Sequence, residues 1–282
     1  QGTDQDDSEA LGWYRKAAEQ GNAAAQFSVG TMFKFGQGTD QDDSEALGWY
    51  RKAAEQGNAA AQFSVGTMFK FGQGTDQDDS EALGWFRKAA EQGDADAQFG
   101  VGTMFQNGLG TDQDDSEALG WYRKAAEQGD ADAQFSLGTM FKFGLGTDQD
   151  DSEALGWYLK AAEQGHAHAQ FNLGDMFEYG LGTDRDDSEA LRWYRKAAEQ
   201  GDADAQFRSG EMFEYGEGID RDDSEALGWY RKAAEQGHAH AQFNLGDMFE
   251  NGEGTDRDDS EALAWYRKAA EQGEADAQVS LD

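Results

Sequence analysis

The feature that most constrains this chain is an internal repeat with a period of 36 residues. The string GTDQDDSEALGWYRKAAEQG begins at Gly2 and returns seven times with small changes. The eight repeats start at residues 2, 38, 74, 110, 146, 182, 218 and 254, and the last one is partial. A repeat this short cannot bury an apolar face alone, so successive copies are expected to stack around a continuous core. The sequence therefore predicts one solenoid over residues 1–282.

Each repeat is predicted to form two helices. In the first repeat, Asp6 followed by Glu9 is a start signal like a capping box, and apolar residues then recur at helical spacing to about residue 20. Asn22 is the expected cap of a second helix, which Gly36 ends. No segment shows the period-two alternation of a strand. We expect an all-α fold of about fifteen helices, each about 12–15 residues long, plus a short terminal stub.

The composition excludes several classes of protein. The 282 residues include 57 acids and 23 bases, which gives a formal net charge of -34. This charge argues against sequence-independent binding to DNA, RNA or an anionic membrane, because two negative surfaces would meet. The chain has no cysteine, so it forms no disulfide and has no thiolate metal site or cysteine nucleophile. No apolar run approaches the roughly 18 residues of a membrane span.

The residues within each repeat resemble a known family. AQFSVGTMFKFGQG, a loop, and then DDSEALGWYRKAAEQG are similar to the Sel-one-like repeat (SLR), a subclass of the tetratricopeptide (TPR) superfamily. The resemblance covers essentially the whole chain and implies a right-handed α-solenoid. Members act mostly as adaptors and scaffolds. Secreted relatives staple each repeat with a cysteine pair, and the lack of cysteine argues against that branch.

The family convention names the Gln-Phe helix A and the Trp-Tyr helix B. The chain then opens with a lone helix B, continues with seven A–B pairs and closes with a stub at residues 274–282. In the stub Val279 replaces the usual Phe and Asp282 replaces the usual Gly. We expect either an end cap or the point at which a longer array stops, and the change from Phe to Val favours a genuine terminus. The tryptophan that recurs in helix B is interpreted as a packing ladder between repeats.

The copies differ mainly on one face of helix A, which we call the variable face. In the first repeat it carries Ala24, Ser28, Thr31 and Phe35, with Lys34 alongside. By the resemblance to TPR proteins, this face lines a concave groove. Taking His as neutral, its charge at the positions of residues 24, 31, 34 and 35 is +1 over the first four repeats and -7 over the next three. The groove is thus expected to become strongly acidic and to attract a basic partner.

The predicted partner-binding residues lie on this variable face. They are Phe35, Phe71, Phe143, His168, Asp175, Glu178, Tyr179, Asp204, Glu211, Glu214, Tyr215, His240, Asp247 and Glu250. The phenylalanines would offer an apolar surface, the carboxylates would accept hydrogen bonds, and the tyrosines would add cation–π contacts.

The remaining motifs do not predict a metal site, a calcium site or an active site. The sequence GHAHAQ occurs twice, but His166 and His238 stand where other copies have a capping Asn or Asp, so no metal site is predicted. The acidic loops lack EF-hand spacing, and helix capping explains Asp6 and Glu9. No catalytic motif is present, so the chain is not expected to be an enzyme or to need a cofactor.

Two functions remain open. The first is a scaffold or adaptor that binds a basic or basic-aromatic protein or peptide and neither nucleic acid nor membrane. The alternative is a structural spacer, or an engineered or consensus array, with no specific ligand; the identity of residues 2–37 and 38–73 favours it. The lone helix B at residues 6–20 should leave apolar surface uncovered, which predicts end-to-end self-association.

Overall fold

A computed structural model describes the backbone of residues 3–280, with the side chains of residues 6–278 and 280. The chain forms two compact halves, one up to Gln149 and one from Asp150, which are described separately. In the described residues there are sixteen helices and no strand. The predicted all-α fold of two-helix repeats is therefore confirmed, and neighbouring helices pack as in a solenoid. Whether residues 1–282 form one solenoid stays a prediction.

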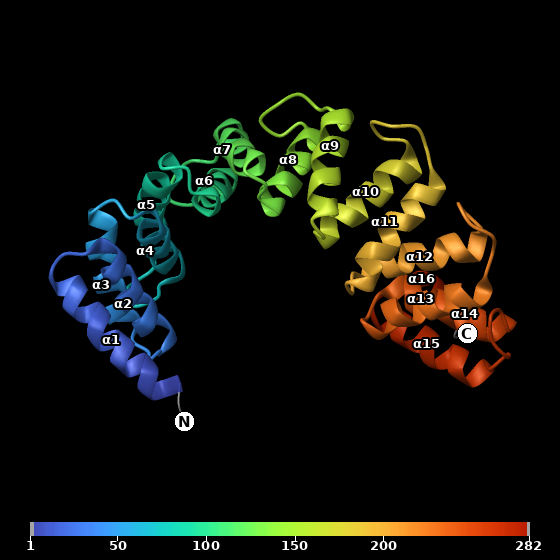
Figure 1. The fold of residues 1–282 in the computed structure, drawn as a ribbon. Coiled ribbons are helices and arrows are strands. Elements are labelled where there is room, and N and C mark those ends of the chain that lie inside the picture. The colour runs from blue at the N-terminus through green and yellow to red at the C-terminus, as the bar shows by residue number, and fades with distance from the viewer. Residues whose placement is uncertain (1–2, 281–282) are drawn as a thin grey trace. The chain divides into compact units, whose positions relative to one another are not determined.

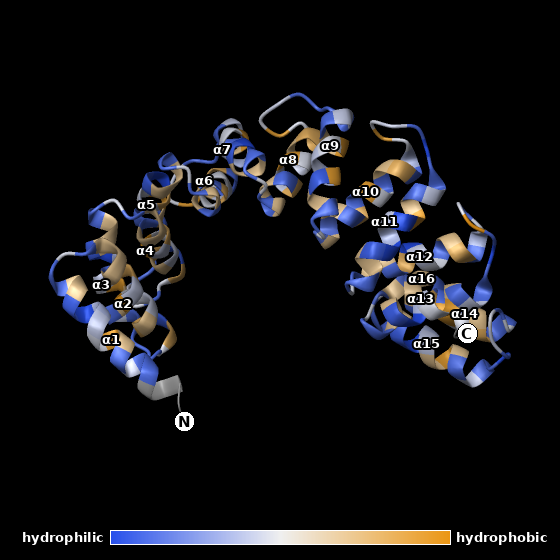
Figure 2. Ribbon diagram, in the orientation of Figure 1, coloured by the Kyte–Doolittle hydropathy of each residue, from blue (hydrophilic) through white to orange (hydrophobic). Residues whose placement is uncertain are grey.

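The odd-numbered helices are the predicted B helices: α1 (Thr3–Glu19), α3 (Asp43–Glu55), α5 (Asp79–Glu91), α7 (Asp115–Glu127), α9 (Asp151–Glu163), α11 (Asp187–Glu199), α13 (Asp223–Glu235) and α15 (Asp259–Glu271). The even-numbered helices are the A helices: α2 (Ala23–Phe35), α4 (Ala59–Phe71), α6 (Ala95–Asn107), α8 (Ala131–Phe143), α10 (Ala167–Tyr179), α12 (Ala203–Tyr215), α14 (Ala239–Asn251) and α16 (Ala275–Val279). In the first half, the even-numbered helices line the inner side of the curve that the helices follow (Figure 1). The helices are amphipathic, with hydrophobic residues gathered where they face one another (Figure 2).

The predicted cap at Asn22 is present, and the one predicted at Asp6 is found at its counterpart Asp42. Asn22 Oδ1 accepts a 2.9 Å hydrogen bond from the Ala25 amide, and Asp42, the counterpart of Asp6, accepts one of 3.0 Å from Glu45. The first helix differs from the prediction, since it starts at Thr3 and leaves Asp6 inside it. In the next repeat the Asp42 amide donates 2.9 Å to the Phe33 carbonyl of the preceding helix A, which holds the cap extended. The described residues contain no such contact for Asp6, which lies within the first turns of α1.

A glycine in helix A makes room for an aromatic ring of helix B. A Cβ added to Gly30 would lie 2.6 Å from Cδ1 of Tyr50, and one added to Gly102 would lie 2.7 Å from the same atom of Tyr122. Both tyrosine rings are buried. The glycine is therefore required by close packing within each A–B pair, since its backbone is ordinary helix.

A buried glutamine in helix A joins three consecutive helices. Gln62 Nε2 donates 3.0 Å to the Ala54 carbonyl at the end of α3, while its Oε1 accepts 2.7 Å from Gln92 after α5. The equivalent bonds recur at Gln26, Gln98, Gln170, Gln206 and Gln242. The Ala-Gln pair of the motif thus satisfies buried polar groups between successive repeats.

The tryptophans pack as predicted in the second half, where Trp229 and Trp265 belong to the core. Each described Trp also has a Lys three residues later over its ring, as Lys232 lies 3.7 Å from the Trp229 centroid. In α1, by contrast, Trp13 is 63% and Tyr14 is 44% exposed. The expected uncovered apolar surface of this helix is confirmed.

The predicted stub forms the five-residue helix α16, which packs on α15. The expectations for the side chain of Val279 and for Asp282 fall outside the described residues. Nowhere in the described part of the chain is a helix long and apolar enough to cross a membrane.

Candidate partner-binding face

The aromatic residues predicted on the variable face are solvent-exposed. Phe35, Phe71 and Phe143 are each at least 60% exposed, and Tyr179 and Tyr215 are similar. An apolar ring with this exposure adds little to the stability of the fold and leaves surface available for another molecule. The last residue of helix A therefore projects away from the core in these repeats.

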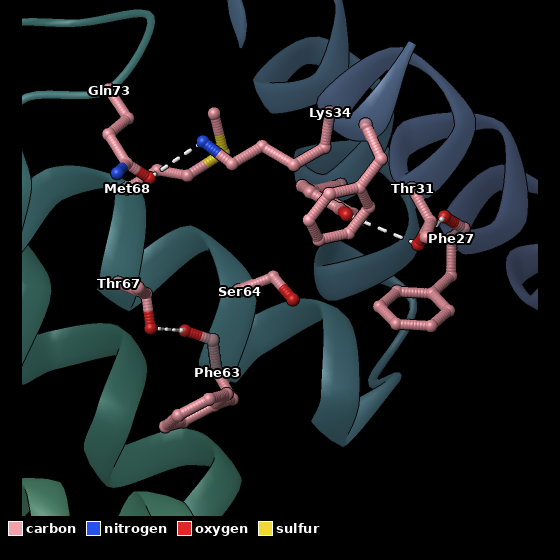
Figure 3. A pocket seen from close by; sticks show the side chains of 10 residues that line it. Phe27, Thr31, Lys34, Phe63, Ser64, Thr67, Met68 and Gln73 are labelled. Carbon is pink, nitrogen blue, oxygen red and sulfur yellow. Dashed lines mark hydrogen bonds between the residues drawn. The ribbon is translucent and has the colours of Figure 1, made fainter. Parts of the chain in front are cut away.

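An apolar pocket of about 290 Å³ lies between α2 and α4 on this face. Figure 3 shows Phe27 and Thr31 of α2 facing Phe63 and Ser64 of α4 across it. Lys34 crosses the upper edge, where its Nζ donates 2.8 Å to Gln73 Oε1 and pairs with Asp43 at 3.1 Å. A second pocket of about 250 Å³ repeats this arrangement between α4 and α6.

The acidic residues of the variable face are hydrogen-bonded by the tyrosine of helix B. Tyr194 donates to Asp175 Oδ1 and Glu178 Oε2, both at 2.7 Å. Two further repeats use the same arrangement: Tyr230 donates 2.5 Å to Glu214, and Tyr266 donates 2.5 Å to Asp247 and 2.7 Å to Glu250. In the neutral repeats the same hydroxyl reaches a threonine, as Tyr50 does at 3.2 Å from Thr31. Each of these carboxylates thus keeps only part of its accepting capacity for a partner.

Burial is the main influence on ionisation at this face. It raises the pKa of Glu214 and of Asp247 above the usual range, and neighbouring carboxylates, among them Glu253 for both, raise them further. The hydroxyl of Tyr230 has its pKa raised by burial and by the adjacent Glu214. The charged forms of these two carboxylates are therefore disfavoured by burial and by their acidic neighbours, and a cation beside them would favour ionisation.

Arg208 is a charged residue of the variable face that is not among the predicted partner-binding residues. It occupies the position of Ser28 on α12, and its guanidinium lies 2.5 Å from Glu178 Oε1 and 2.8 Å from Glu211 Oε2. It also donates to the Tyr179 hydroxyl. Counting this residue lowers the negative charge of the face in the fifth to seventh repeats from -7 to -6. The signal was present in the sequence, because Ser28 was already recognised as a variable position.

Two of the four histidines cap helices, as interpreted from the sequence, and the other two lie beside carboxylates. His166 and His238 each accept a 3.1 Å hydrogen bond at Nδ1 from the amide three residues later. His168 and His240 are exposed and lie near the carboxylates of Asp202 and Glu274, at 3.4 and 2.8 Å. Among the described residues no three His, Asp or Glu side chains are placed to hold a metal ion.

The remaining predicted residue, Asp204, is exposed and pairs with His238 at 3.3 Å. The structure places all fourteen predicted residues on the even-numbered helices. It separates them into exposed side chains, such as Phe35 and Asp204, and half-buried ones, such as Glu178 and Glu211. That they bind a partner stays a prediction.

Comparison with known families identifies the repeat. The description "Sel1 repeat" matches eight segments, 1–22, 23–58, 59–94, 95–130, 131–166, 167–202, 203–238 and 239–274. The chain belongs to the Sel1 repeat family. The first segment contains only the helix B α1, and each of the other seven runs from a helix A through the following helix B, as the family convention requires. Sel1 repeats are non-catalytic scaffolds that generally mediate protein–protein interaction.

Two solved structures of Sel1 repeat proteins are similar over nearly the whole chain. One is a protective antigen of uropathogenic Escherichia coli with an SLR fold, with 39% identity, a TM-score of 0.94 and 96% of this chain covered. The other is a Sel1 repeat protein from Oxalobacter formigenes, with 36% identity, a TM-score of 0.78 and 97% covered. The chain spans 58% of the first protein and 79% of the second. No curated protein matches the chain.

Proposed function

We propose that this protein is a non-enzymatic scaffold whose variable face binds a protein or peptide, and that the cationic part of the partner lies over the fifth to seventh repeats. The family supports the general role, since Sel1 repeats mediate protein interactions. The specific proposal rests mainly on one observation. The packing residues are nearly constant between copies; the position of Val29 is buried and varies among Val, Leu and Ser, but the changes in charge fall on exposed or half-buried positions of helix A.

Charge supports a basic partner. The carboxylate of Asp204 is exposed, and burial raises the pKa of Glu214 and of Asp247, so a partner's cation beside these two would offset the cost of ionising them. In the first half, Phe35 and the pocket beside it supply apolar contacts instead. A partner with basic and aromatic residues complements both kinds of surface.

The alternative is a spacer with no specific ligand. The identity of residues 2–37 and 38–73 is the observation that favours it, because a binding surface gains nothing from exact duplication. A spacer needs an even, soluble surface and a fixed repeat geometry. It does not need the exposed aromatic side chains at Phe35, Phe71 and Phe143.

A peptide array tests the proposal directly. Basic, basic-aromatic and acidic peptides are probed with the wild-type chain and with the double variant Asp204→Lys, Glu250→Lys, in which both residues are exposed. The matched control is Glu225→Lys, Glu235→Lys on helix B, which changes the net charge equally. Glu211 and Glu214 are avoided because they are half-buried as well as bonded to Arg208 and Tyr230, whereas Asp204 and Glu250 make their contacts with His238 and Tyr266 from exposed positions.

We expect saturable binding of basic-aromatic peptides that weakens with salt and falls at least about tenfold more in the variable-face variant than in the control. Equal losses in the two variants would show that bulk charge alone attracts the peptides. No saturable binding at low or high salt would leave the spacer as the better account.

A further inference from the structure

The environment of Arg208 is repeated 36 residues later without the arginine. Arg208 contacts Glu178, Tyr179 and Glu211. Their counterparts are Glu214, Tyr215 and Asp247, so each contact type is kept: a glutamate and a tyrosine from one helix A and a carboxylate from the next. Asn244 stands in the place of Arg208.

The two positions face the same surroundings. The guanidinium of Arg208 lies 6.0 Å from the ring centroid of Tyr194, on the preceding helix B. Asn244 is hydrogen-bonded to Tyr230, the counterpart of Tyr194. Asn is several atoms shorter than Arg and carries no charge, so Asn244 cannot pair with the carboxylates of the neighbouring helix A as the guanidinium of Arg208 does between α10 and α12.

The charge at the second location lacks a matching cation. Between α10 and α12, Arg208 pairs with both carboxylates. Between α12 and α14, Glu214 and Asp247 accept hydrogen bonds from Tyr230 and Tyr266 instead. Arg221 acts on Glu214 only weakly, since it is itself paired with Asp223 at 2.6 Å and with Glu253 at 3.5 Å.

We infer that Glu214, Tyr215 and Asp247, beside Asn244, bind the guanidinium group of an arginine side chain from a partner polypeptide. This deepens the proposed function, on which it rests, by naming the residue that the acidic part of the face recognises. The model for the contact is inside the chain itself, since the equivalent residues bind Arg208. Guanidinium is favoured over ammonium because its planar fork reaches two carboxylates on different helices and also contacts a tyrosine.

The test uses nuclear magnetic resonance of the folded chain with the blocked tripeptide Ac-Gly-Arg-Gly-NH2. We expect saturable shifts of backbone amides in α12 and α14. The same peptide with citrulline, which is nearly isosteric but neutral, should give none, and the lysine peptide should bind at least about tenfold more weakly.

Two variants exchange the occupied and open locations. Asn244→Arg supplies the internal arginine and should abolish binding, whereas Arg208→Asn should open a second location and add shifts in α10. Gly228→Arg is the control for net charge. Its Cβ would meet nothing within 4 Å, and Arg192 already occupies the equivalent position on α11, so this variant should fold and bind like wild type.

Equal shifts with the citrulline peptide, or unchanged binding by Asn244→Arg, would overturn the inference, and so would an absence of shifts with every peptide. If the resonance experiment finds no arginine-specific binding but the peptide array shows saturable binding, the scaffold function stands without an arginine site. The opposite pattern would mean that the arginine site exists but that the variable face is not the surface that the array peptides recognise.

Discussion

Gln92, directly after α5, donates a 2.7 Å hydrogen bond from Nε2 to Oε1 of Gln62 on α4. Gln62 is 5% exposed and spends its own Nε2 on the Ala54 carbonyl of the preceding helix B. One side chain therefore links three helices that lie next to one another in the stack. The strength of this link follows from burial, because a buried amide that loses its partner pays its full cost of desolvation.

Gln62→Leu is predicted to destabilise the first half by about 1–3 kcal/mol, since it removes both hydrogen bonds of this buried amide, although the Ala54 carbonyl keeps the 3.0 Å bond from the Gly57 amide. Gln92→Ala is the matched control. Gln92 is exposed, and water can replace its bond to Gln62, so its loss should cost less than about 1 kcal/mol. Hydrogen exchange is the suitable measurement, because it reports opening of α4 separately from the rest of a repeat protein. Equal costs for the two variants would contradict the assigned link.

Glycines in the two helices of a repeat are predicted to respond in opposite ways to the same substitution. Gly102→Ala places a methyl group 2.7 Å from Cδ1 of the buried Tyr122 ring and should destabilise by about 1–3 kcal/mol. Gly120→Ala lies inside α7 on an exposed surface with nothing within 4 Å of the new Cβ. It should stabilise by up to about 1 kcal/mol through helix propensity.

Urea unfolding of Gly102→Ala and Gly120→Ala, with the slopes compared as well as the midpoints, measures both effects. A neutral result at Gly102 would mean that the Tyr122 ring moves aside at little cost, and the close packing would then not explain the glycine in helix A.

The repeat period, the helix pairs and their caps were all predictable from the sequence, because each depends on residues close together in the chain. Asn22 and Asp42 show this, since the donor that each one caps lies three residues away. The function of Arg208 was not predictable in this way. Its carboxylate partner Glu178 is 30 residues distant and becomes a neighbour only when two helices A stack.

The tyrosine of helix B shows the same limit. Periodicity assigned it correctly to the apolar stripe, and the Tyr194 ring is buried. Its hydroxyl, however, reaches Asp175 and Glu178, which had been assigned to a partner alone. The sequence shows no link between this hydroxyl and the variable face, because Phe86, which lacks the hydroxyl, and Tyr50, which has it, follow identical helices A.

Self-association through α1 is predicted from Trp13 and Tyr14, which are exposed on the outer end of the first repeat. Large exposed rings favour a partner surface, and the net charge of -34 opposes contact between two copies. The association should therefore appear at high salt, where the repulsion is screened. Sedimentation velocity at molar salt should show a concentration-dependent larger species that Trp13→Glu removes. A single monomer over the whole concentration range would refute this prediction.

His238 is predicted to make stability depend on pH near neutrality. Its Nδ1 caps α14 through the Ala241 amide, its Nε2 faces Asp204 at 3.3 Å, and its ring stacks on Phe207 with centroids 4.6 Å apart. Burial lowers its pKa below the usual value, and this outweighs the opposing effect of Asp204; the neighbouring His240 lowers the pKa further. Protonation at Nδ1 would also remove the capping acceptor.

The sign follows from proton binding. Because the folded pKa lies below the unfolded one, the unfolded chain binds more protons as the pH falls through about 6.5, so the stability present above that pH is progressively lost below it. His238→Asn keeps a cap of the kind that Asn22 forms and should remove this contribution. The difference in unfolding free energy between wild type and variant should change by on the order of 1 kcal/mol between pH 8 and pH 5.

The reciprocal variant Asn58→His places a histidine at the cap of α4, near Phe27. It faces Ala24 in place of Asp204, so it should introduce a loss of stability at low pH that is at least as large. A pH-independent difference in both comparisons would show that folding does not change the pKa of the imidazole at these caps, and would contradict the prediction.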